Sequence, residues 1–277
     1  MVRLLQIEFI KLWNNRSSKI LIITYFVLLT SVTLFAAIKF DIGPIKFHLA
    51  EQGIFNFPYI WHFNTYITAL FKLFLAIVIV SMMANEYSNK TIKQNLIDGL
   101  SKKEFILSKF LTVVVFALVS TIFVFAVSLI LGLMYSDYNE FSIIFSDLEY
   151  LLSFFVKLVG FFSFCLFLGI LIKRSAFALG FLIIWCILEQ LLFGILGWQI
   201  TTWENANRIK RFFPIQSISD LIKEPFSRLK SVQSVANQIG EDFQFDYNVH
   251  WYQILTVVTW TAIFIYFSYR LLKKRDL

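Results

Sequence analysis

Long apolar runs constrain the fold of this chain more than any other feature. A helix needs about 20 apolar residues to cross the roughly 30 Å hydrocarbon core of a bilayer. Six stretches meet this requirement, at residues 20–38, 66–83, 107–134, 151–172, 176–196 and 251–269. Hydrophobic residues make up 58% of the chain and charged residues 16%, whereas charged residues are roughly 25% of a soluble domain. The sequence therefore predicts an all-α polytopic membrane protein with six transmembrane helices, in a single domain over residues 1–277.

The positions of Lys and Arg predict the orientation of the spans. Of the 25 such residues, 15 lie in segments that share a side with the N-terminus and 8 lie in the other connections. The connection around Asp137, Glu140, Asp147 and Glu149 carries four acids and no base. Because cytoplasmic loops are enriched in Lys and Arg, we expect both termini on the cytoplasmic side.

Residues 1–19 lack the pattern of a cleaved signal peptide and predict an amphipathic helix at the inner membrane interface. The predicted apolar side holds Val2, Leu5, Phe9, Leu12 and Trp13, and the polar side holds Arg3, Gln6, Lys11 and Asn14. Ile7 and Ile10 depart from this pattern because they point into the polar side. Two interpretations stay open: an ordinary membrane-proximal start, or burial of these two side chains against a partner.

A polar, basic segment at residues 85–109 separates the second and third apolar runs. Ile92, Leu96 and Ile97 give one apolar side to a short helix that would begin near residue 89 or 90 and break at Gly99. The sequence Ser101-Lys102-Lys103-Glu104 is a capping box, so the third spanning helix is predicted to begin well before the bilayer. This organisation predicts a docking element for a soluble partner, with an ordinary solvated loop as the alternative.

The same segment resembles the permeases of type-2 ABC transporters, the membrane subunits of exporters. Their signature is an acid, a Gly-Thr pair, a Leu, then Ser-Arg and a distal Lys. The residues that match in order are Glu86, Thr91, Leu96 or Leu100, Ser101, Lys103 and Lys109. The chain departs from the signature with Lys90 in place of Gly, no Pro before Ser101, and Lys102-Lys103 where Arg is frequent.

The resemblance implies a role and a set of partners. Residues 85–106 would be the cytoplasmic coupling segment, seated in a separate ABC ATPase subunit that is present in two copies and binds ATP and Mg. The coupling residues would be Glu86, Thr91, Ile92, Leu96, Leu100, Ser101 and Lys103. A second permease copy, or a similar permease, would complete the pathway in a bacterial cytoplasmic membrane. The chain has no G-x-x-x-x-G-K-[ST] phosphate loop, so we expect no cofactor and no catalytic residue in it.

Three ionisable residues fall inside the predicted spans: Lys72, Lys157 and Glu189. Each lies seven to nine residues from the external end of its span, or about 10–13 Å at 1.5 Å per residue. Because a charge at mid-membrane is costly, these residues are candidates for the pathway, where Glu189 could pair with either lysine. The alternative for the lysines is snorkelling to the outer head groups. Gln190 could hydrogen-bond a neighbouring helix.

Residues 198–250 form a long external connection. After Pro214, helical spacing continues through Ile218, Leu221, Ile222, Phe226 and Leu229, with Pro225 predicted to interrupt it. We expect a short amphipathic helix or helical hairpin on the outer membrane surface, as a cap on the pathway or as a simple lid.

Other functions have weaker support in the sequence. His48, His62 and His250 are assigned to separate external connections, so we expect no metal site. A secondary transporter or channel that works alone is disfavoured by the scarcity of intramembrane charge and the lack of an internal repeat. A membrane anchor for a soluble machine would keep the docking segment and need no pathway. The predicted function is ATP-driven export of a hydrophobic or amphipathic cargo, and the cargo itself is not encoded in a recognisable motif.

Overall fold

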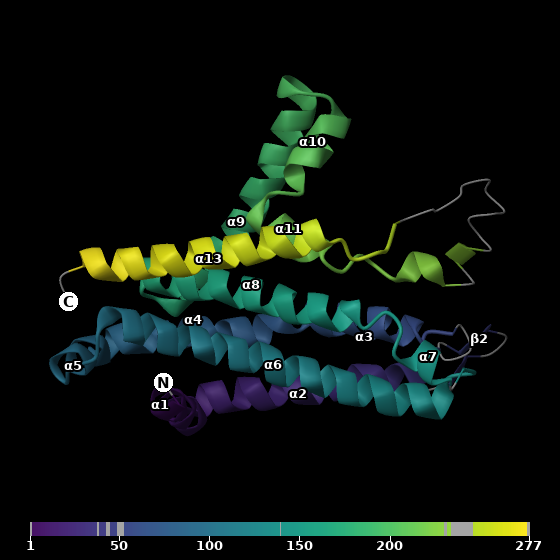
Figure 1. Ribbon diagram of the computed structural model, residues 1–277, viewed down its shortest axis with the longest axis horizontal. Coiled ribbons are helices and arrows are strands. Elements are labelled where there is room, and N and C mark those ends of the chain that lie inside the picture. The colour runs from purple at the N-terminus through teal and green to yellow at the C-terminus, as the bar shows by residue number, and fades with distance from the viewer. Residues whose placement is uncertain are drawn as a thin grey trace.

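The computed structural model describes residues 2–37, 39–42, 45–48, 53–138, 140–229, 232–233 and 246–275, with the side chains of residues 32–48 outside this description. Most of the described chain is helical, and the long helices run side by side along one axis (Figure 1). In chain order the first elements are α1 (Val2–Asn14), α2 (Arg16–Ala37), β1 (Lys39–Ile42), β2 (Ile45–His48), α3 (Tyr59–Leu70), α4 (Lys72–Ser88) and α5 (Thr91–Ile97). They are followed by α6 (Lys102–Tyr135), α7 (Phe141–Ile144), α8 (Glu149–Ile172), α9 (Ser175–Ile195), η2 (Leu196–Ile200), α10 (Trp203–Lys210), α11 (Pro214–Asp220), η3 (Phe226–Arg228) and α13 (Trp251–Lys274).

Four helical segments of the described chain are long and apolar enough to cross a membrane: Lys102–Tyr135, Phe141–Ile172, Ser175–Ile200 and Trp251–Lys274. The bent pair α3 and α4 would make a fifth. The predicted run at 20–38 coincides with α2, but its side chains beyond residue 31 fall outside the described residues. The multi-pass helical class is therefore confirmed, whereas the number six stays a prediction.

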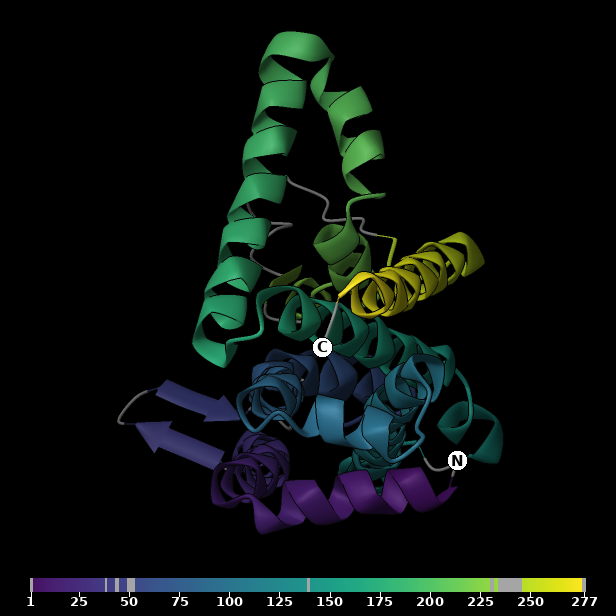
Figure 2. The ribbon, with the colours of Figure 1, turned by 90° about the vertical axis from the view of Figure 1, so that its left-hand side faces the viewer.

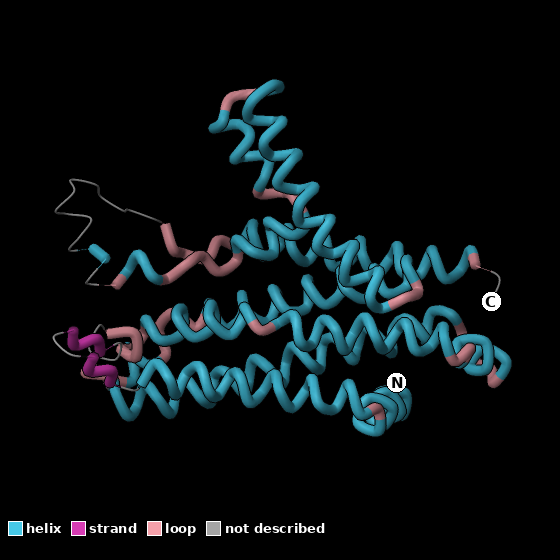
Figure 3. The backbone as a smooth tube through the Cα atoms, turned by 180° about the vertical axis from the view of Figure 1, so that it is seen from behind, coloured by secondary structure: helices cyan, strands magenta, loops and turns pink. Residues whose placement is uncertain are grey.

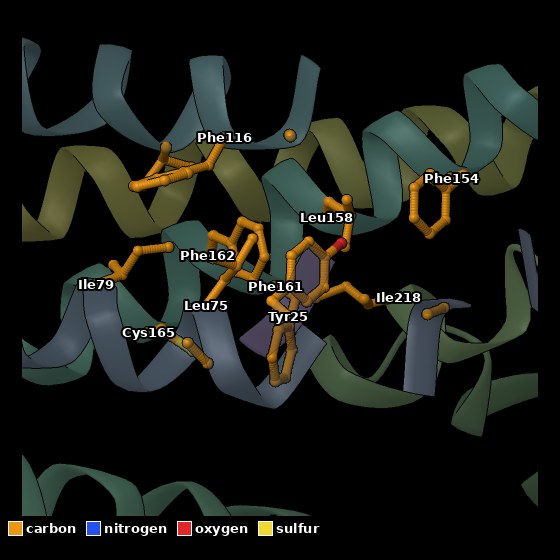
Figure 4. Packing of buried hydrophobic residues seen from close by; sticks show 14 of the residues in the cluster. Tyr25, Leu75, Ile79, Phe116, Phe154, Leu158, Phe161, Phe162, Cys165 and Ile218 are labelled. Atoms are coloured by element: carbon orange, nitrogen blue, oxygen red, sulfur yellow. The ribbon is translucent and has the colours of Figure 1, made fainter. Parts of the chain in front are cut away.

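Helix α8 is the centre of the bundle. Viewed end-on, it lies between α13 on one side and the pair α4 and α6 on the other, with α2 and α1 beyond that pair (Figure 2). Phe161 and Phe162 of α8 pack among Tyr25 of α2 and Leu75 and Ile79 of α4 (Figure 4). Among the described helices, α8 contributes more residues to the core than any other.

The second predicted span begins earlier than its apolar run. We expected residues 66–83, but the helix starts at Tyr59 and bends by 45° where α3 meets α4. Polar residues lower the hydropathy of α3 and hid this part from the sequence prediction. Each is satisfied internally: for example, Asn64 donates to Ser128 Oγ at 2.9 Å, and Thr68 donates to the Asn64 carbonyl at 2.6 Å. His62, which we assigned to an external connection, is consequently buried in α3.

One short β-hairpin qualifies the all-α prediction. Strands β1 and β2 pair antiparallel, with Phe40 opposite Phe47 in the register. The hairpin lies at the end of the bundle away from both chain termini (Figure 3). Helices nevertheless make up nearly all the regular structure of the described residues.

Helix α9 leaves the bundle and forms an arm. Its buried residues are Ala178, Leu182 and Glu189, and η2 and α10 return from its tip (Figures 1 and 2). The chain then re-enters the bundle as α11, which ends at Asp220, well before Leu229, where we expected the helical spacing to end. Pro225 lacks an N–H and restricts the residue before it, so only the short turn η3 follows. Ile218 and Ile222 are buried against the bundle. The location of this segment at the outer membrane surface stays a prediction.

Candidate functional site

Both chain termini and α5 lie at one end of the bundle, which we call the terminal end (Figure 1). The predicted coupling segment has the expected organisation there. Lys90 adopts a left-handed conformation before α5, Gly99 has a φ of 95° after it, and α6 starts at Lys102. The predicted capping box is confirmed: the Glu104 amide donates to Ser101 Oγ at 3.2 Å, and the Ser101 amide donates to Glu104 Oε2 at 3.0 Å.

Four charged side chains meet at the terminal end in what we call the ion cluster: Glu8 and Lys11 of α1, Glu86 of α4 and Lys109 of α6. Lys109 Nζ lies 2.6 Å from Glu8 Oε2 and 2.7 Å from Glu86 Oε1. Lys11 Nζ lies 3.0 Å from Glu86 Oε1 and 3.9 Å from Glu8 Oε1. The cluster therefore joins three helices that are far apart in the sequence.

The ion cluster is buried and electrically balanced. The Lys109 side chain is 0% exposed and the Glu8 and Glu86 side chains are 6% and 5% exposed, whereas Lys11 is 40% exposed. Two acids and two bases sum to zero charge. Burying an ion costs several kcal/mol unless a partner compensates it, so each member depends on the others.

The amphipathic pattern of α1 explains how Glu8 reaches the ion cluster. The side of α1 that faces the bundle holds Leu5, Glu8, Phe9 and Leu12, which are three or four residues apart. The Phe9 ring lies 5.5 Å from the Phe116 ring of α6, between centroids. Glu8 is therefore carried into an apolar contact that also packs α1 on α6.

The remaining predictions for α1 concern which of its side chains are buried. Leu5, Phe9 and Leu12 of the predicted apolar side pack against the bundle, whereas Val2 and Trp13 are exposed. The location of α1 at the membrane interface stays a prediction. Ile7 and Ile10, the two residues that broke the predicted pattern, are also exposed. A partner-facing role for Ile7 and Ile10 stays a prediction.

Thr91 connects α5 to the ion cluster. Its hydroxyl donates to Glu86 Oε2, the carboxylate oxygen that neither lysine contacts, and lies 3.3 Å from the Glu86 carbonyl. The matched residues Glu86, Thr91 and Lys109 thus come together from α4, α5 and α6. A displacement of α5 would act directly on the central carboxylate.

The apolar side of α5 faces the protein. Ile92 is 2% exposed and packs in the core, while Leu96 and Leu100 are half-buried against it. A direct contact of Ile92 with a docked partner stays a prediction. Ile97 is 70% exposed. Its neighbours Lys93 and Asp98 are also exposed, and so is Lys103 on the first turn of α6. These residues form the free side of the segment.

An open cavity of about 350 Å³ adjoins the ion cluster. It lies between α1, the start of α2, and the junction of α4 with α5. Its polar lining includes Asn15, Asn85 and Asn89, together with the carboxylates of Glu8 and Glu86. The cluster is therefore reachable from the terminal end, although most of it is buried.

Arg275 forms a second connection at the terminal end, which the sequence did not indicate. Its guanidinium donates to the Leu171 carbonyl at 2.9 Å, to the Ile170 carbonyl and to the Tyr87 hydroxyl at 3.2 Å. The Lys102 amine donates to the Arg275 carbonyl at 3.0 Å. Arginine near a helix C-terminus satisfies carbonyls that lack intrahelical partners. The residues after α13 thus tie the end of α8 to the start of α6.

Glu189 has backbone partners and no lysine partner among the described residues. Its carboxylate accepts hydrogen bonds from the amides of Ile215 and Gln216 at 2.9 and 3.0 Å, and from the Trp185 indole at 2.8 Å. These amides belong to the first turn of α11, where N–H groups lack intrahelical acceptors. Glu189 therefore holds α11 against the arm. Gln190 beside it is exposed.

Lys157 also has backbone partners. Its amine donates to the carbonyls of Ser219 and Ile222 at 3.0 and 3.4 Å, and the residue is 4% exposed. The snorkelling expected as the alternative does not occur for Lys157, because its amine turns into the bundle. The Lys72 amine lies 4.5 Å from the centroid of the Phe161 ring.

A fold of apolar helices arranged around α8 defines the class: a multi-pass membrane protein. The family model described as "ABC-2 family transporter protein" matches residues 4–277, and the chain belongs to that family. A comparison with curated protein sequences returned no match. The chain is therefore a membrane permease component of an ABC transporter, of a family whose transmembrane subunits generally lack their own ATPase and associate with an ABC ATPase subunit.

Proposed function

We propose that this chain is the permease half of an exporter and couples ATP hydrolysis in a separate nucleotide-binding subunit to the export of a hydrophobic or amphipathic cargo. The observation that carries the proposal is the position of α5. Its free side is exposed at the terminal end, and its first residue, Thr91, contacts the central carboxylate of the ion cluster. A force on α5 would pass through Glu86 to two other helices.

The proposed topology has six spans: α2, the bent pair α3 and α4, α6, α8, α9 and α13. Both termini, α1 and α5 would face the cytoplasm, in agreement with the excess of Lys and Arg in these segments. Two ATPase subunits would bind two permease chains, either two copies of this one or this one with a similar permease. The location would be a bacterial cytoplasmic membrane.

The proposed coupling mechanism uses contacts on both sides of α5. Ile97, Lys93 and Lys103 would contact the ATPase subunit, which supplies the ATP and Mg sites. Ile92, Leu96 and Leu100 would transmit the movement because they pack against the core, and Ser101 would fix the start of α6. Since Lys109 contacts both Glu8 and Glu86, α1 and α6 would move together with α4.

The test compares two single substitutions of exposed apolar residues. Ile97→Glu changes the free side of α5, and Phe141→Glu, at 78% exposure on α7, is the matched control at the opposite end of the bundle. The tagged chain would be purified in mild detergent, and the amount of ABC ATPase recovered per permease would be measured together with its ATPase activity. We expect Ile97→Glu to remove most of the bound ATPase and Phe141→Glu to retain it.

Two results would contradict the proposal. The first is equal recovery of the ATPase with both variants, which would exclude α5 as the docking element. The second is recovery of the permease alone under conditions that preserve its oligomers, which would favour a transporter or channel that works without a partner.

A further inference from the structure

A cavity of about 420 Å³ opens between α3, α8 and the turn that follows α11. Helices α3 and α8 are in contact along this half of the bundle, away from the terminal end (Figure 1). The residues that define its character are Tyr66, Leu70, Lys72, Lys157, Asp220 and Tyr247. Two lysine amines from within the helices thus line one cavity.

Lys157 is the fixed amine of the cavity. Its two hydrogen bonds to the carbonyls of Ser219 and Ile222 hold the amine in place. A carbonyl carries only a partial negative charge, so these contacts do not occupy the amine as a carboxylate would.

Lys72 is the cation without an acceptor. Among the described residues it contacts the Phe161 ring, and it has no hydrogen-bond acceptor or carboxylate partner. An ammonium group away from bulk water interacts strongly with an anion, because the surrounding dielectric constant is low. An anionic ligand would supply the partner that Lys72 lacks.

The acids beside the cavity are engaged elsewhere. Glu224 accepts from the amides of Phe226 and Ser227 and from the Ser227 hydroxyl. Asp220 accepts from the Gln216 side chain at 2.6 Å, and burial raises the pKa of its carboxyl. Lys223 donates to the Asp246 carbonyl. Three lysines and two acids line the cavity, so basic side chains outnumber acidic ones by formal charge.

The rim of the cavity is apolar on the outer face of α3. Leu70, which lines the cavity, is 58% exposed, and Leu73 nearby is 49% exposed. In a membrane-spanning helix such side chains face lipid chains. The cavity therefore offers cations inside and an apolar exit to the side, which is the arrangement that an amphiphile with an anionic head group requires.

We propose that this cavity binds a phosphate-bearing amphiphile, with the head group on the Lys72 amine beside Lys157 and the apolar chains leaving past Leu70. The inference deepens the proposed function because it names a ligand class for the permease, and it rests on that function only for the step of transport. Binding itself requires neither the ATPase subunit nor ATP.

The test measures binding to the purified full chain in a mild nonionic detergent. The probe is phosphatidic acid with a fluorophore on its acyl chain. Its binding is measured by fluorescence polarisation. Lys72→Met removes the charge and keeps an apolar stem of similar length, Lys72→Arg restores the charge, and Lys273→Met changes an exposed lysine at the terminal end as the control. Thermal unfolding of each variant checks that it is folded.

We expect saturable binding that Lys72→Met weakens by about tenfold or more, since charge-assisted contacts are the strong ones. Lys72→Arg and Lys273→Met should stay within about threefold of the unchanged chain. Unlabelled phosphatidic acid should displace the probe, whereas phosphatidylcholine, whose head group carries no net charge, should not. Bound phosphatidic acid should also raise the unfolding temperature of the unchanged chain more than that of Lys72→Met.

Other results would overturn the inference. Equal displacement by phosphatidylcholine, or unchanged binding in a folded Lys72→Met variant, would exclude an anion site at Lys72. Displacement by millimolar glycerol 3-phosphate as effective as that by phosphatidic acid would assign the site to soluble phosphate esters and reject the amphiphile. Because Ile97→Glu should bind the probe normally, failure of this inference is distinguishable from failure of the coupling proposal.

Discussion

The ion cluster at the terminal end and the contacts of Glu189 and Lys157 solve the same problem in different ways. Each places charges inside an apolar bundle. In the ion cluster, side chains neutralise one another, with Lys109 between two carboxylates. Glu189 and Lys157 instead bind backbone amides and carbonyls of the segment from Ile215 to Ile222.

The two kinds of contact have different mechanical consequences: the ion cluster couples helices to one another, whereas Glu189 and Lys157 anchor a single segment. A network of opposite charges from three helices makes those helices interdependent, because moving one member leaves another charge without its partner. A charge that binds backbone groups fixes one short segment in place and leaves the rest of the bundle independent. We therefore expect changes in the ion cluster to spread through the terminal end, and changes at Glu189 to stay local.

The largest expected effect tests the interdependence. Lys109→Met leaves Glu8 and Glu86 buried with only the half-exposed Lys11 as a counter-charge. Removing one partner of a buried pair costs about 3–5 kcal/mol, so the free energy of unfolding in mild detergent should fall by that amount. Lys103→Met, an exposed lysine near the start of the same helix, should change it by less than about 0.5 kcal/mol.

A double substitution sharpens the same test. Glu86→Gln combined with Lys109→Met leaves one acid and one base, Glu8 and Lys11, and should be more stable than the sum of the two single effects predicts. Strictly additive effects would show that the cluster members act independently, and the comparison drawn above would then fail.

Glu189→Leu should have an intermediate and local effect. Two amides of α11 lose a charged acceptor, which costs roughly 1.5–3 kcal/mol. Hydrogen exchange followed by mass spectrometry should show faster exchange in residues 214–222 and unchanged exchange in α1 and α5. Gln190→Leu is the neighbouring control because Gln190 is exposed. Faster exchange at the terminal end would show that Glu189 also belongs to a spreading network.

The smallest expected effect concerns the turn between α5 and α6. Gly99 has a φ of 95°, and a methyl group added to its Cα would meet no atom within 4 Å. Gly99→Ala should therefore lower the free energy of unfolding only by the cost of placing an alanine in the left-handed conformation, about 1–2 kcal/mol. Gly180→Ala in α9, which is equally free of contacts and helical, should be neutral or stabilising. Thermal unfolding of both variants measures the contrast; equal shifts would mean that the turn does not need glycine.

The sequence predicted the terminal end better than the rest of the chain. The capping box, the break at Gly99 and the short helix α5 follow from local rules, and Glu86, Thr91 and Lys109 followed from the order of a motif. Glu8 was missed although a signal was present: it falls between Leu5 and Phe9 on the side of α1 that packs on the bundle. A charge on an apolar helix face indicates a buried partner.

The anchoring contacts lay beyond sequence reasoning. Glu189 binds amides 26 and 27 residues later, and only the path of the chain through η2 and α10 brings them back. The early start of α3 was also hidden, because hydropathy counts Asn64 and Thr68 as polar although their hydrogen bonds are satisfied inside the bundle. Local patterns predict elements; they do not predict which distant backbone groups a charge will meet.

The ion cluster also imposes an order on biosynthesis. Glu8 is synthesised before its closest cation, Lys109, which follows 101 residues later. Until the start of α6 leaves the ribosome, Glu8 cannot contact Lys109, so the cluster cannot close. Chains are made from the N-terminus at about 5–20 residues per second, so the first helix waits several seconds for its partner. The cluster can therefore close only after α1, α4 and the start of α6 have all been synthesised.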